Sequence, residues 1–499
     1  MAFSKNTHKF LIGFFLLIIS FNCKSETEIA SAISSTSVAG TLTVSADGVF
    51  MRNGKAYQGI GVNYFNAFYR TILNTSDTTY SAGFKYLSNN KIPFVRFSAT
   101  GFWPNELSLY QTNKALYFSA LDKFVKCAER NGVGLIPSLF WFYATVPDLM
   151  GEHMNQWANP NSKTIAFMRT YTAEVVSRYK DSPAIWGWEI GNEFNSYCDL
   201  LDQAINFLPK VNIAGGTPAT RTIEDAFTTN ILRAALTEFT TTVRMYDPNR
   251  PIFSGNAMPA ANMYHRYKYA NWTQDSSADF TSLLDVQNPS GLKSLTIHLY
   301  PDQVINHFSN KIADINIVIQ EAMRSANELK RPFFLGEFGS PKTLGTVIEA
   351  QKFQEILSAV IDNKVQLSAL WVYDFSSQDA DWNITQTNSR KYQLDAIINA
   401  NAQFLLSAGI NETKDINLSC SVYPNPTSDI VQLKVGASSM INSQSMSYQL
   451  YDMQGRLLET KKIVAELTNI AVNNLVPSIY FVKIIQENQE VKVFKIIKD

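Results

Sequence analysis

The chain has 499 residues, of which 45% are hydrophobic and 17% charged, so it can build a large core and exceeds one ordinary domain. Lys plus Arg and Asp plus Glu both total 43, and this balance argues against a nucleic-acid or anionic-membrane partner because no basic excess is available for phosphate. The four cysteines, Cys23, Cys127, Cys198 and Cys420, show no CxxC or Cys/His metal spacing and imply no disulfide framework, although one pair among the last three stays open.

The first residues have the pattern of a targeting segment. Two lysines precede an apolar run from Phe10 to Phe21, which is shorter than the roughly 20 residues that a membrane-spanning helix needs. This pattern predicts a secretory signal peptide over residues 1–23 rather than a membrane anchor. Lipidation at Cys23 is the alternative, but the residues just before it are not the small ones of a lipoprotein box. The Ser- and Thr-rich residues 24–40 predict a flexible linker.

From Thr41 the chain predicts a short hairpin with turns at Asp47-Gly48 and Asn53-Gly54. Apolar, β-prone runs then alternate with helical patterns. The eight predicted strands are 58–65, 93–99, 134–141, 184–193, 251–256, 294–300, 332–339 and 367–375. The clearest predicted helices are 117–131, 163–180, 222–246, 312–329, 346–363 and 391–407.

Strand–helix alternation of this kind indicates a parallel sheet with both faces buried. Eight such units without a GxGxxG opening favour a closed (β/α)₈ barrel over residues 41–408, rather than a doubly wound open sheet. The stretch Cys198 to Arg221 is too long for a simple loop and is expected to shape the catalytic face, and Tyr264 to Asn288 is expected to be a second long insertion. After about Ala408 the composition changes, and residues 416–499 predict a separate small all-β sandwich domain.

Polar and aromatic side chains gather at the predicted strand ends, which meet on one face of such a barrel. These residues are Arg96, Asn192, Glu193, His298, Tyr300, Glu337 and Trp371. The period of two along a strand lets His298 and Tyr300 both point inward. Strict alternation would separate Asn192 from Glu193, so the site requires a bulge or the start of a loop there, which the neighbouring Gly191 makes easier.

Two of these residues have the chemistry of a glycosidase pair. Glycoside hydrolysis commonly uses one protonated carboxyl as acid and one ionised carboxyl as nucleophile or base. Glu193 and Glu337 fit these roles. We expect Arg96 to lower the pKa of Glu337 and Tyr300 to donate a hydrogen bond to it, while burial against aromatic rings keeps the proton on Glu193.

Each residue also has a structural interpretation. A single glutamate at a strand end is more often solvated or ion-paired, and Glu189 is expected to lie deeper, as a hydrogen-bonded carboxylate of the barrel interior. Trp103, Trp141, Trp157 and Trp382 lie in or near strand-end loops, where each could stack on a sugar or pack in the core. No HExxH, GxSxG or P-loop pattern supports another enzyme class, and this chemistry requires no metal or cofactor.

The runs IPFVRFSA, WGWEIGNEFN, LTIHLYP, PFFLGEFGS and SALWVYDF resemble, in order, the signature strands of glycoside hydrolase family 5, the cellulase and β-mannanase family of retaining (β/α)₈ glycosidases. The resemblance covers about Val44 to Leu406. It implies that Glu193 is the acid/base and Glu337 the nucleophile. The other implied substrate-site residues are Arg96, Asn192, His298, Tyr300 and Trp371, with Trp103 and Trp141 as further candidates from the adjacent loops.

One departure bears on the substrate. Many members of the family have a histidine at the end of strand three, where this chain has Phe140-Trp141. A retaining enzyme for a β-1,4-mannan or β-1,4-glucan is the predicted function, and a non-catalytic glycan-binding surface protein on the same barrel is the alternative.

The tail resembles a second known module. YPNPTSD (423–429), YDMQGRLL (451–458), IYFVKI (479–484) and a basic finish resemble the sorting domain of the type IX secretion system of Bacteroidota. The resemblance implies passage through the outer membrane by its secretion machinery, followed by release or surface attachment. A carbohydrate-binding sandwich is the alternative for this tail.

Overall fold

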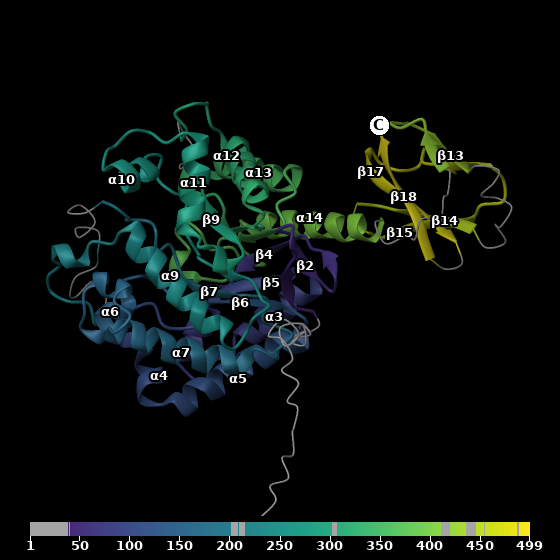
Figure 1. The fold of residues 1–499 in the computed structure, drawn as a ribbon. Helices are drawn as coiled ribbons and strands as arrows, with labels where there is room; N and C mark the ends of the chain where they lie inside the picture. Colours follow the sequence, from purple (N-terminus) through teal and green to yellow (C-terminus); the bar gives the residue numbers. More distant parts are fainter. Residues whose placement is uncertain are drawn as a thin grey trace, which may run out of the picture. The chain divides into compact units, whose positions relative to one another are not determined.

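A computed structural model shows that the chain forms a barrel followed by a β-domain (Figure 1). The described residues are 38, 40–200, 208, 215–301, 307–410, 420–435, 446–453, 455–486 and 489–499. The predicted signal peptide, its alternative lipidation at Cys23, and nearly all of the predicted linker lie outside these residues.

Eight parallel strands form one sheet in the order β8-β7-β6-β5-β4-β11-β10-β9, which is the cyclic chain order of a barrel. The strands are β4 (Gly59–Asn63), β5 (Phe94–Ser98), β6 (Gly134–Phe140), β7 (Trp188–Gly191), β8 (Ile252–Phe253), β9 (Leu295–Leu299), β10 (Phe333–Phe338) and β11 (Leu367–Leu370). An open doubly wound sheet would not have this order, so the predicted (β/α)₈ barrel is confirmed.

The seam of the barrel lies between β8 and β9. The Ser294 hydroxyl donates to the Ile252 carbonyl at 2.6 Å, and the Ser254 hydroxyl donates to the Asn288 side chain at 2.7 Å. All four residues are buried. Side chains therefore join the two strands across the seam.

Every residue of these eight strands is buried, as near-continuous apolar runs predict for a sheet covered on both faces. The predicted fourth strand began too early, because only an isolated bridge at Ile185 precedes β7, which starts at Trp188. The predicted eighth strand was too long, since β11 ends at Leu370 and the chain there enters the strand-end loop.

Helices surround the strands on the outside (Figure 1). They are α2 (Ala67–Leu73), α3 (Tyr80–Asn89), α4 (Ser108–Thr112), α5 (Lys114–Asn131), α6 (Thr145–Met150), α7 (Lys163–Tyr179), α9 (Thr229–Arg244), α10 (Met263–Tyr269), α11 (Ser277–Gln287), α12 (Ile315–Leu329), α13 (Thr346–Asp362) and α14 (Lys391–Ile410). Side-chain caps mark several starts: Asn113 caps α5, Ser162 caps α7 and Asp314 caps α12.

Two helical predictions were wrong in detail. α9 begins at Thr229 rather than at residue 222, because Thr228 caps it and a separate 3₁₀ turn, η4 (Ile223–Asp225), precedes it. The stretch 264–288, expected to be an insertion, holds most of α10 and all of α11, the crossover helix between β8 and β9. Ser276 and Asp279 form a capping box there, a signal that the sequence contained.

The predicted hairpin is a three-stranded sheet of β1 (Leu42–Val44), β2 (Phe50–Arg52) and β3 (Lys55–Ala56). Its Leu42 and Phe50 share a buried cluster with barrel residues, among them Phe94, Trp186 and Phe334. The hairpin therefore packs its apolar side against residues of the barrel strands.

The C-terminal domain is all β, as predicted. One sheet has the order β12-β13-β16 and the other β15-β14-β17-β18. Its strands are β12 (Cys420–Tyr423), β13 (Ile430–Val435), β14 (Met446–Tyr451), β15 (Leu457–Lys462), β16 (Leu467–Ala471), β17 (Ser478–Gln486) and β18 (Gln489–Lys498). Residues of both sheets, including Val431, Leu433, Tyr448 and Val482, form one buried core, as in a sandwich.

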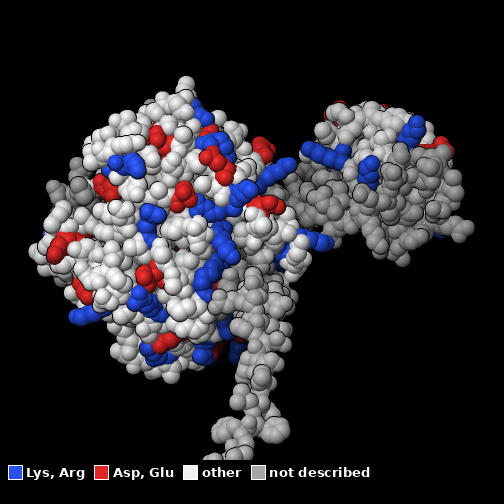
Figure 2. Space-filling view, in the orientation of Figure 1, with Lys and Arg blue, Asp and Glu red and all other residues white. Residues whose placement is uncertain are grey.

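The surface carries charges of both signs, interspersed on the face that Figure 2 shows. Among the helices of the described residues, none is long and apolar enough to cross a membrane. Cys127, Cys198 and Cys420 are free thiols, and the first two are buried.

Candidate functional site

The site is built around Arg96, whose side chain at the middle of β5 is fully buried. Its Nε donates to both carboxylate oxygens of Glu189 at 2.9 Å, and its Nη1 donates to Glu337 Oε1 at 2.7 Å. Its Nη2 donates to Asn192 Oδ1 at 2.8 Å, and Nη1 also reaches Asn63 Oδ1 at 3.0 Å. One guanidinium therefore links residues of β4, β5, β7 and β10 and of the loop that follows β7.

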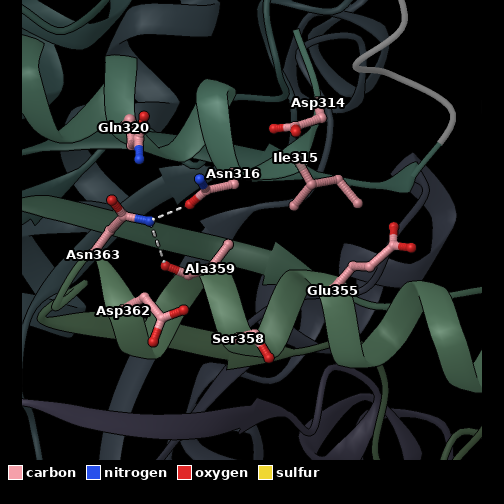
Figure 3. Close-up of a pocket in the computed structure, with 9 residues that line it drawn as sticks. All are labelled: Asp314, Ile315, Asn316, Gln320, Glu355, Ser358, Ala359, Asp362 and Asn363. Carbon is pink, nitrogen blue, oxygen red and sulfur yellow. Dashed lines mark hydrogen bonds between the residues drawn. The ribbon is translucent and has the colours of Figure 1, made fainter.

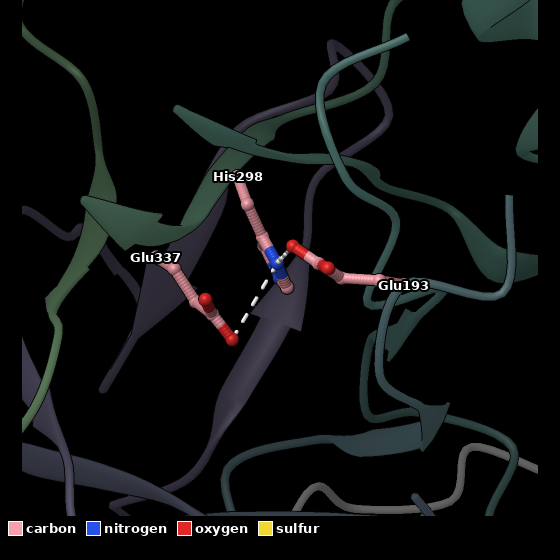
Figure 4. A group of neighbouring side chains, drawn as sticks. All are labelled: Glu193, His298 and Glu337. Carbon is pink, nitrogen blue, oxygen red and sulfur yellow. Dashed lines mark hydrogen bonds and ion pairs between the residues drawn. The ribbon is translucent and has the colours of Figure 1, made fainter. Parts of the chain in front are cut away.

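Glu337 lies on β10 beside its neighbours from β9. Tyr300 donates its hydroxyl to Glu337 Oε2 at 2.6 Å, and His298 Nδ1 lies 3.5 Å from Glu337 Oε1. His298 Nδ1 is also 2.9 Å from Glu193 Oε1. Figure 4 shows His298 between the two carboxyl groups, with all three side chains directed to one point.

The backbone turns Glu193 into the site. The chain leaves β7 at Gly191, and Glu193 adopts a left-handed conformation with φ of 53°. Two hydrogen bonds fix this turn: Asn192 N–H donates to the Trp141 carbonyl at 2.6 Å, and Glu193 N–H donates to the Gly255 carbonyl at 2.7 Å. A non-glycine residue held at positive φ costs about 1–3 kcal/mol and persists only where the surroundings enforce it. The expected departure from strict alternation is thus a left-handed conformation at Glu193, the second residue after the strand.

The two glycines around this turn are required for close packing. A Cβ at Gly191 would lie 1.9 Å from the Phe140 carbonyl oxygen. A Cβ at Gly255, which has φ of 63°, would lie 1.9 Å from the Gly191 carbonyl oxygen. Strands β6, β7 and the end of β8 therefore approach one another more closely than any side chain allows.

Burial controls the acidity of the site. It raises the pKa of Glu193, against the opposing charge of Arg96. It also raises the pKa of Glu337, against the charge of Arg96 and the hydrogen bond from Tyr300. Burial lowers the pKa of His298 to about 4, so the imidazole is neutral at pH 7. Arg96 lowers the pKa of Glu337, as predicted, but the loss of hydration on burial outweighs this effect, so the net shift is upward.

Glu193, His298 and Glu337 each offer one ligand atom, and these atoms lie within 4.8 Å of one another, so the trio has the spacing of a metal site. The guanidinium of Arg96 already contacts Glu337, however, and a second cation there would meet direct charge repulsion. The donor set fits a pair of carboxyl groups ordered by an arginine better than it fits a metal centre.

The predicted aromatic residues lie beside this network. Trp103 and Trp141 pack edge to face with ring centroids 4.4 Å apart, and both are half-buried. Trp371 is half-buried against Phe65, and its indole N–H donates to Gln378 at 3.0 Å. Trp382 packs on Tyr300 with centroids 4.8 Å apart. These rings are partly open to solvent near the polar cluster.

Trp157 differs from these rings. Its side chain is fully buried and its indole N–H donates to the Tyr143 carbonyl at 2.7 Å, so it belongs to the core. Glu189 lies deeper than the carboxyl pair with no exposed surface, as expected of an interior carboxylate. Asn63 was not predicted, although a polar residue at the end of an otherwise apolar strand run was the available signal.

A separate groove of about 360 Å³ lies between α12 and α13 (Figure 3). Asp314, Glu355 and Asp362 line it, and the Asn363 amide donates to Asn316 at 2.8 Å. These residues belong to the outer helices and to the cap of α12 rather than to strand ends, so the groove is distinct from the carboxyl cluster.

The sequence comparisons identify the family. The family model Cellulase (glycosyl hydrolase family 5) matches residues 52–377, well over half of the chain, and the model Secretion system C-terminal sorting domain matches residues 421–499. The chain belongs to glycosyl hydrolase family 5 and ends in a sorting domain, which indicates a secreted or cell-surface location.

Curated relatives carry mannanase names. Mannan endo-1,4-beta-mannosidase 4 of Solanum lycopersicum is 26% identical over 346 residues, 63% of this chain and 77% of that protein. Probable mannan endo-1,4-beta-mannosidase F of Aspergillus flavus is 38% identical over 79 residues, 15% of this chain and 17% of that protein. The chain thus spans less than a fifth of the length of the Aspergillus relative.

Two solved structures share the barrel. The endo-1,4-beta-mannanase from Rhizomucor miehei matches with a TM-score of 0.51 and 18% identity, covering 73% of this chain and 99% of that one. The endo-beta-1,4-mannanase from Thermotoga petrophila matches with a TM-score of 0.51 and 14% identity, covering 90% of this chain and 99% of that one. At these identities the likeness shows the fold alone.

The buried ion pair gives a stability prediction. Replacing Glu189 by Gln keeps its shape but leaves Arg96 with less negative charge around it, so the barrel should lose about 3 kcal/mol of unfolding free energy. Glu238→Gln is the control, because its pair with Arg169 is partly exposed and should contribute less than about 1 kcal/mol. Denaturant unfolding of both variants measures the loss of unfolding free energy. Equal losses in the two variants would contradict the claim that the buried Arg96–Glu189 pair contributes more than the exposed one.

Proposed function

We propose that this protein is an exported retaining β-glycoside hydrolase that cleaves a β-1,4-linked mannan or glucan by double displacement. Membership of glycosyl hydrolase family 5 and the mannanase names of the curated relatives support this class and favour mannan. The single observation that carries the mechanism is the carboxyl pair, since oxygens of Glu193 and Glu337 lie within 4.8 Å of each other. Retaining enzymes hold their two carboxyl groups about 5–5.5 Å apart, whereas an inverting enzyme needs about 6.5–9.5 Å to admit a water.

In the first step the Glu337 carboxylate attacks the anomeric carbon. The bond from that carbon to the glycosidic oxygen breaks, and Glu193 gives its proton to the departing oxygen. In the second step the Glu193 carboxylate takes a proton from water. The water oxygen attacks the anomeric carbon, the bond to Glu337 breaks, and the sugar leaves with its original configuration.

The surroundings of the two carboxyl groups favour this division of roles. Glu337 receives hydrogen bonds from Arg96 at 2.7 Å and Tyr300 at 2.6 Å, and both stabilise its anion. Glu193 has its carboxyl oxygen 2.9 Å from His298 Nδ1 and keeps 30% of its side chain exposed, where a leaving oxygen can reach it. Since two close carboxyl groups titrate as a pair, the proton that they share resides on Glu193.

The remaining polar residues orient the sugar. Asn192 accepts from Arg96 through its carbonyl oxygen, which leaves its NH₂ group to donate to the 2-hydroxyl. Neutral His298 and the Tyr300 ring border the cleavage point. Trp371, Trp103 and Trp141 offer faces for the C–H side of sugar rings. We assign no metal or cofactor to this chemistry.

The division of the chain follows from the same proposal. Residues 1–23 direct export and 24–40 form a linker, 41–408 carry out hydrolysis, and 416–499 engage the outer-membrane secretion machinery. The match of the sorting-domain model to residues 421–499 supports the last assignment.

The function is tested by incubating the protein with mannan, cellulose and xyloglucan and measuring the new reducing ends that hydrolysis releases. Glu337→Gln should lose at least about 10⁴-fold in kcat because the nucleophile is gone. Glu193→Gln should lose about 10²- to 10⁴-fold because only proton transfer is removed. Glu355→Gln, in the groove between α12 and α13, is the matched control and should keep full turnover.

Two outcomes would overturn the proposal. Undiminished turnover by Glu337→Gln would show that Glu337 is not the nucleophile. Binding of a glycan by the wild type without any new reducing ends would instead favour the non-catalytic alternative.

The pH dependence follows from the two raised pKa values. Activity needs Glu337 ionised and Glu193 protonated, so kcat/KM should rise as Glu337 loses its proton and fall as Glu193 loses its own. Because burial raises the pKa of both groups, both limbs should lie above pH 4.5, the ordinary carboxyl value. A pH profile of kcat/KM checks this, and Glu193→Gln should lack the alkaline limb; an acid limb below pH 4 would contradict the assignment.

A further inference from the structure

Strand β10 is irregular at the residue before Glu337. In its pairing with β9, Leu335 lies opposite Ile297 and Glu337 opposite His298, so Gly336 has no partner. In its pairing with β11 the register also shifts after Leu335. One extra residue therefore lies between Leu335 and Phe338 in both ladders, at Gly336 in the pairing with β9, and such a bulge re-aims the side chain that follows it.

The bulge lies against His298. A Cβ at Gly336 would lie 2.9 Å from His298 Nε2, so no side chain fits there. Glycine permits the bulge but does not fix the orientation of the Gly336 peptide, because glycine populates many backbone conformations with little preference. Some other group must hold the Gly336 peptide in the orientation that presents Glu337 to Arg96 and Tyr300.

Asn63, at the end of β4, makes the required contact. Its Nδ2 donates to the Gly336 carbonyl at 3.0 Å and to the Ala369 carbonyl at 3.2 Å. Its Oδ1 accepts from Arg96 Nη1 at 3.0 Å, and the side chain is fully buried. The same Arg96 nitrogen donates to Glu337 at 2.7 Å.

These partners determine the orientation of the amide. Two of them are carbonyl oxygens, which only accept, and the third is a guanidinium, which only donates. If the amide were reversed, its oxygen would face two carbonyl oxygens and its NH₂ group would face the Arg96 guanidinium, so none of the three hydrogen bonds could form. Asn63 is the residue type that can satisfy two acceptors and one donor from this position, and aspartate, of the same shape, cannot donate when ionised.

We propose that Asn63 is a positioning residue for the nucleophile: it holds the Gly336 bulge and the Arg96 guanidinium together, so that Glu337 is directed at the anomeric carbon. This role deepens the proposed function and rests on it. Asn63 acts on Glu337 from two sides, through the backbone before it and through the cation beside it. Loss of the amide frees both, and displacement of a reacting group by about 1 Å can cost 10²-fold in rate.

The test compares two buried asparagines that both bond the barrel backbone. Asn63→Ala should lower kcat by about 10- to 100-fold with little change in KM, since substrate contacts remain. Asn401→Ala is the matched control: Asn401 is buried, exchanges two hydrogen bonds of 2.8 Å with Ile60 on the same strand β4, and lies away from the bulge. It should lose stability while keeping kcat per folded molecule.

The isosteric variant Asn63→Asp can be tested through the pH profile of kcat/KM, which a loss of stability alone would not shift. Glu337 already faces Arg96, His298, Tyr300 and Glu193, and an added carboxylate would compete for Arg96 and favour the protonated form of Glu337. The acid limb of kcat/KM should move to higher pH in Asn63→Asp and stay in place in Asn401→Ala. This variant also serves if Asn63→Ala does not fold.

A crystal structure of Asn63→Ala or Asn63→Asp gives a readout independent of turnover. Glu337 should move beyond 3.5 Å from Arg96 Nη1, with the Gly336 peptide rotated. An unmoved Glu337, or kcat within threefold of the wild type in the folded variants, would overturn the proposal. If the wild type hydrolyses no β-glycan while Glu337 moves in the variants, positioning stands and the proposed function fails.

Discussion

The buried guanidinium of Arg96 is the constraint on which the rest of the site depends. A cation without exposed surface is strongly unfavourable unless negative and polar groups surround it. Burial would lower the pKa of Arg96, but Glu189 and Glu337 raise it above its ordinary value, so the group stays charged. The barrel therefore has to deliver two carboxylates and two amide oxygens to one point, and these come from β4, β7, β10 and the loop after β7.

Because Arg96 needs compensating charge, the three nearby carboxyl groups differ in burial and in their contacts. Glu189 is fully buried and compensates the charge inside the barrel, whereas Glu337 keeps a small exposed fraction. The carboxyl group of Glu193 lies 2.9 Å from Nδ1 of His298, whose imidazole is neutral at pH 7. In the proposed mechanism the hydrogen bond from Arg96 favours the anion of Glu337, and the proton is assigned to Glu193.

Much of this could be predicted from the sequence. Apolar runs that alternate with helical patterns predict a parallel sheet buried on both faces, and eight such units without a GxGxxG opening favour a closed barrel over an open sheet. The positions of Glu337 near the end of β10 and of Glu193 just after β7 follow from the same alignment of runs, whereas Arg96 was expected at a strand end and lies at the middle of β5. Glu189 was also expected to lie inside, since it precedes the strand end by an even number of residues.

The rest depends on contacts between distant segments. The left-handed backbone at Glu193 is enforced by carbonyls of Trp141 and Gly255, and neither lies near it in the chain. The bulge at Gly336 shows only when β10 is aligned with its neighbours, and the contact of Asn63 with that bulge is visible only in the structure. The sign of the pKa shift at Glu337 required the depth of burial, which a residue pattern does not contain.

The central claim is that Glu337 forms a covalent bond to the sugar. A 2-deoxy-2-fluoro β-glycoside with a good leaving group reacts in the first step but stalls in the second, since fluorine destabilises both cationic transition states. Mass spectrometry of the digested protein should then show one added sugar on the peptide that contains Glu337. An adduct on another residue, or no adduct together with a product of inverted configuration, would contradict the account.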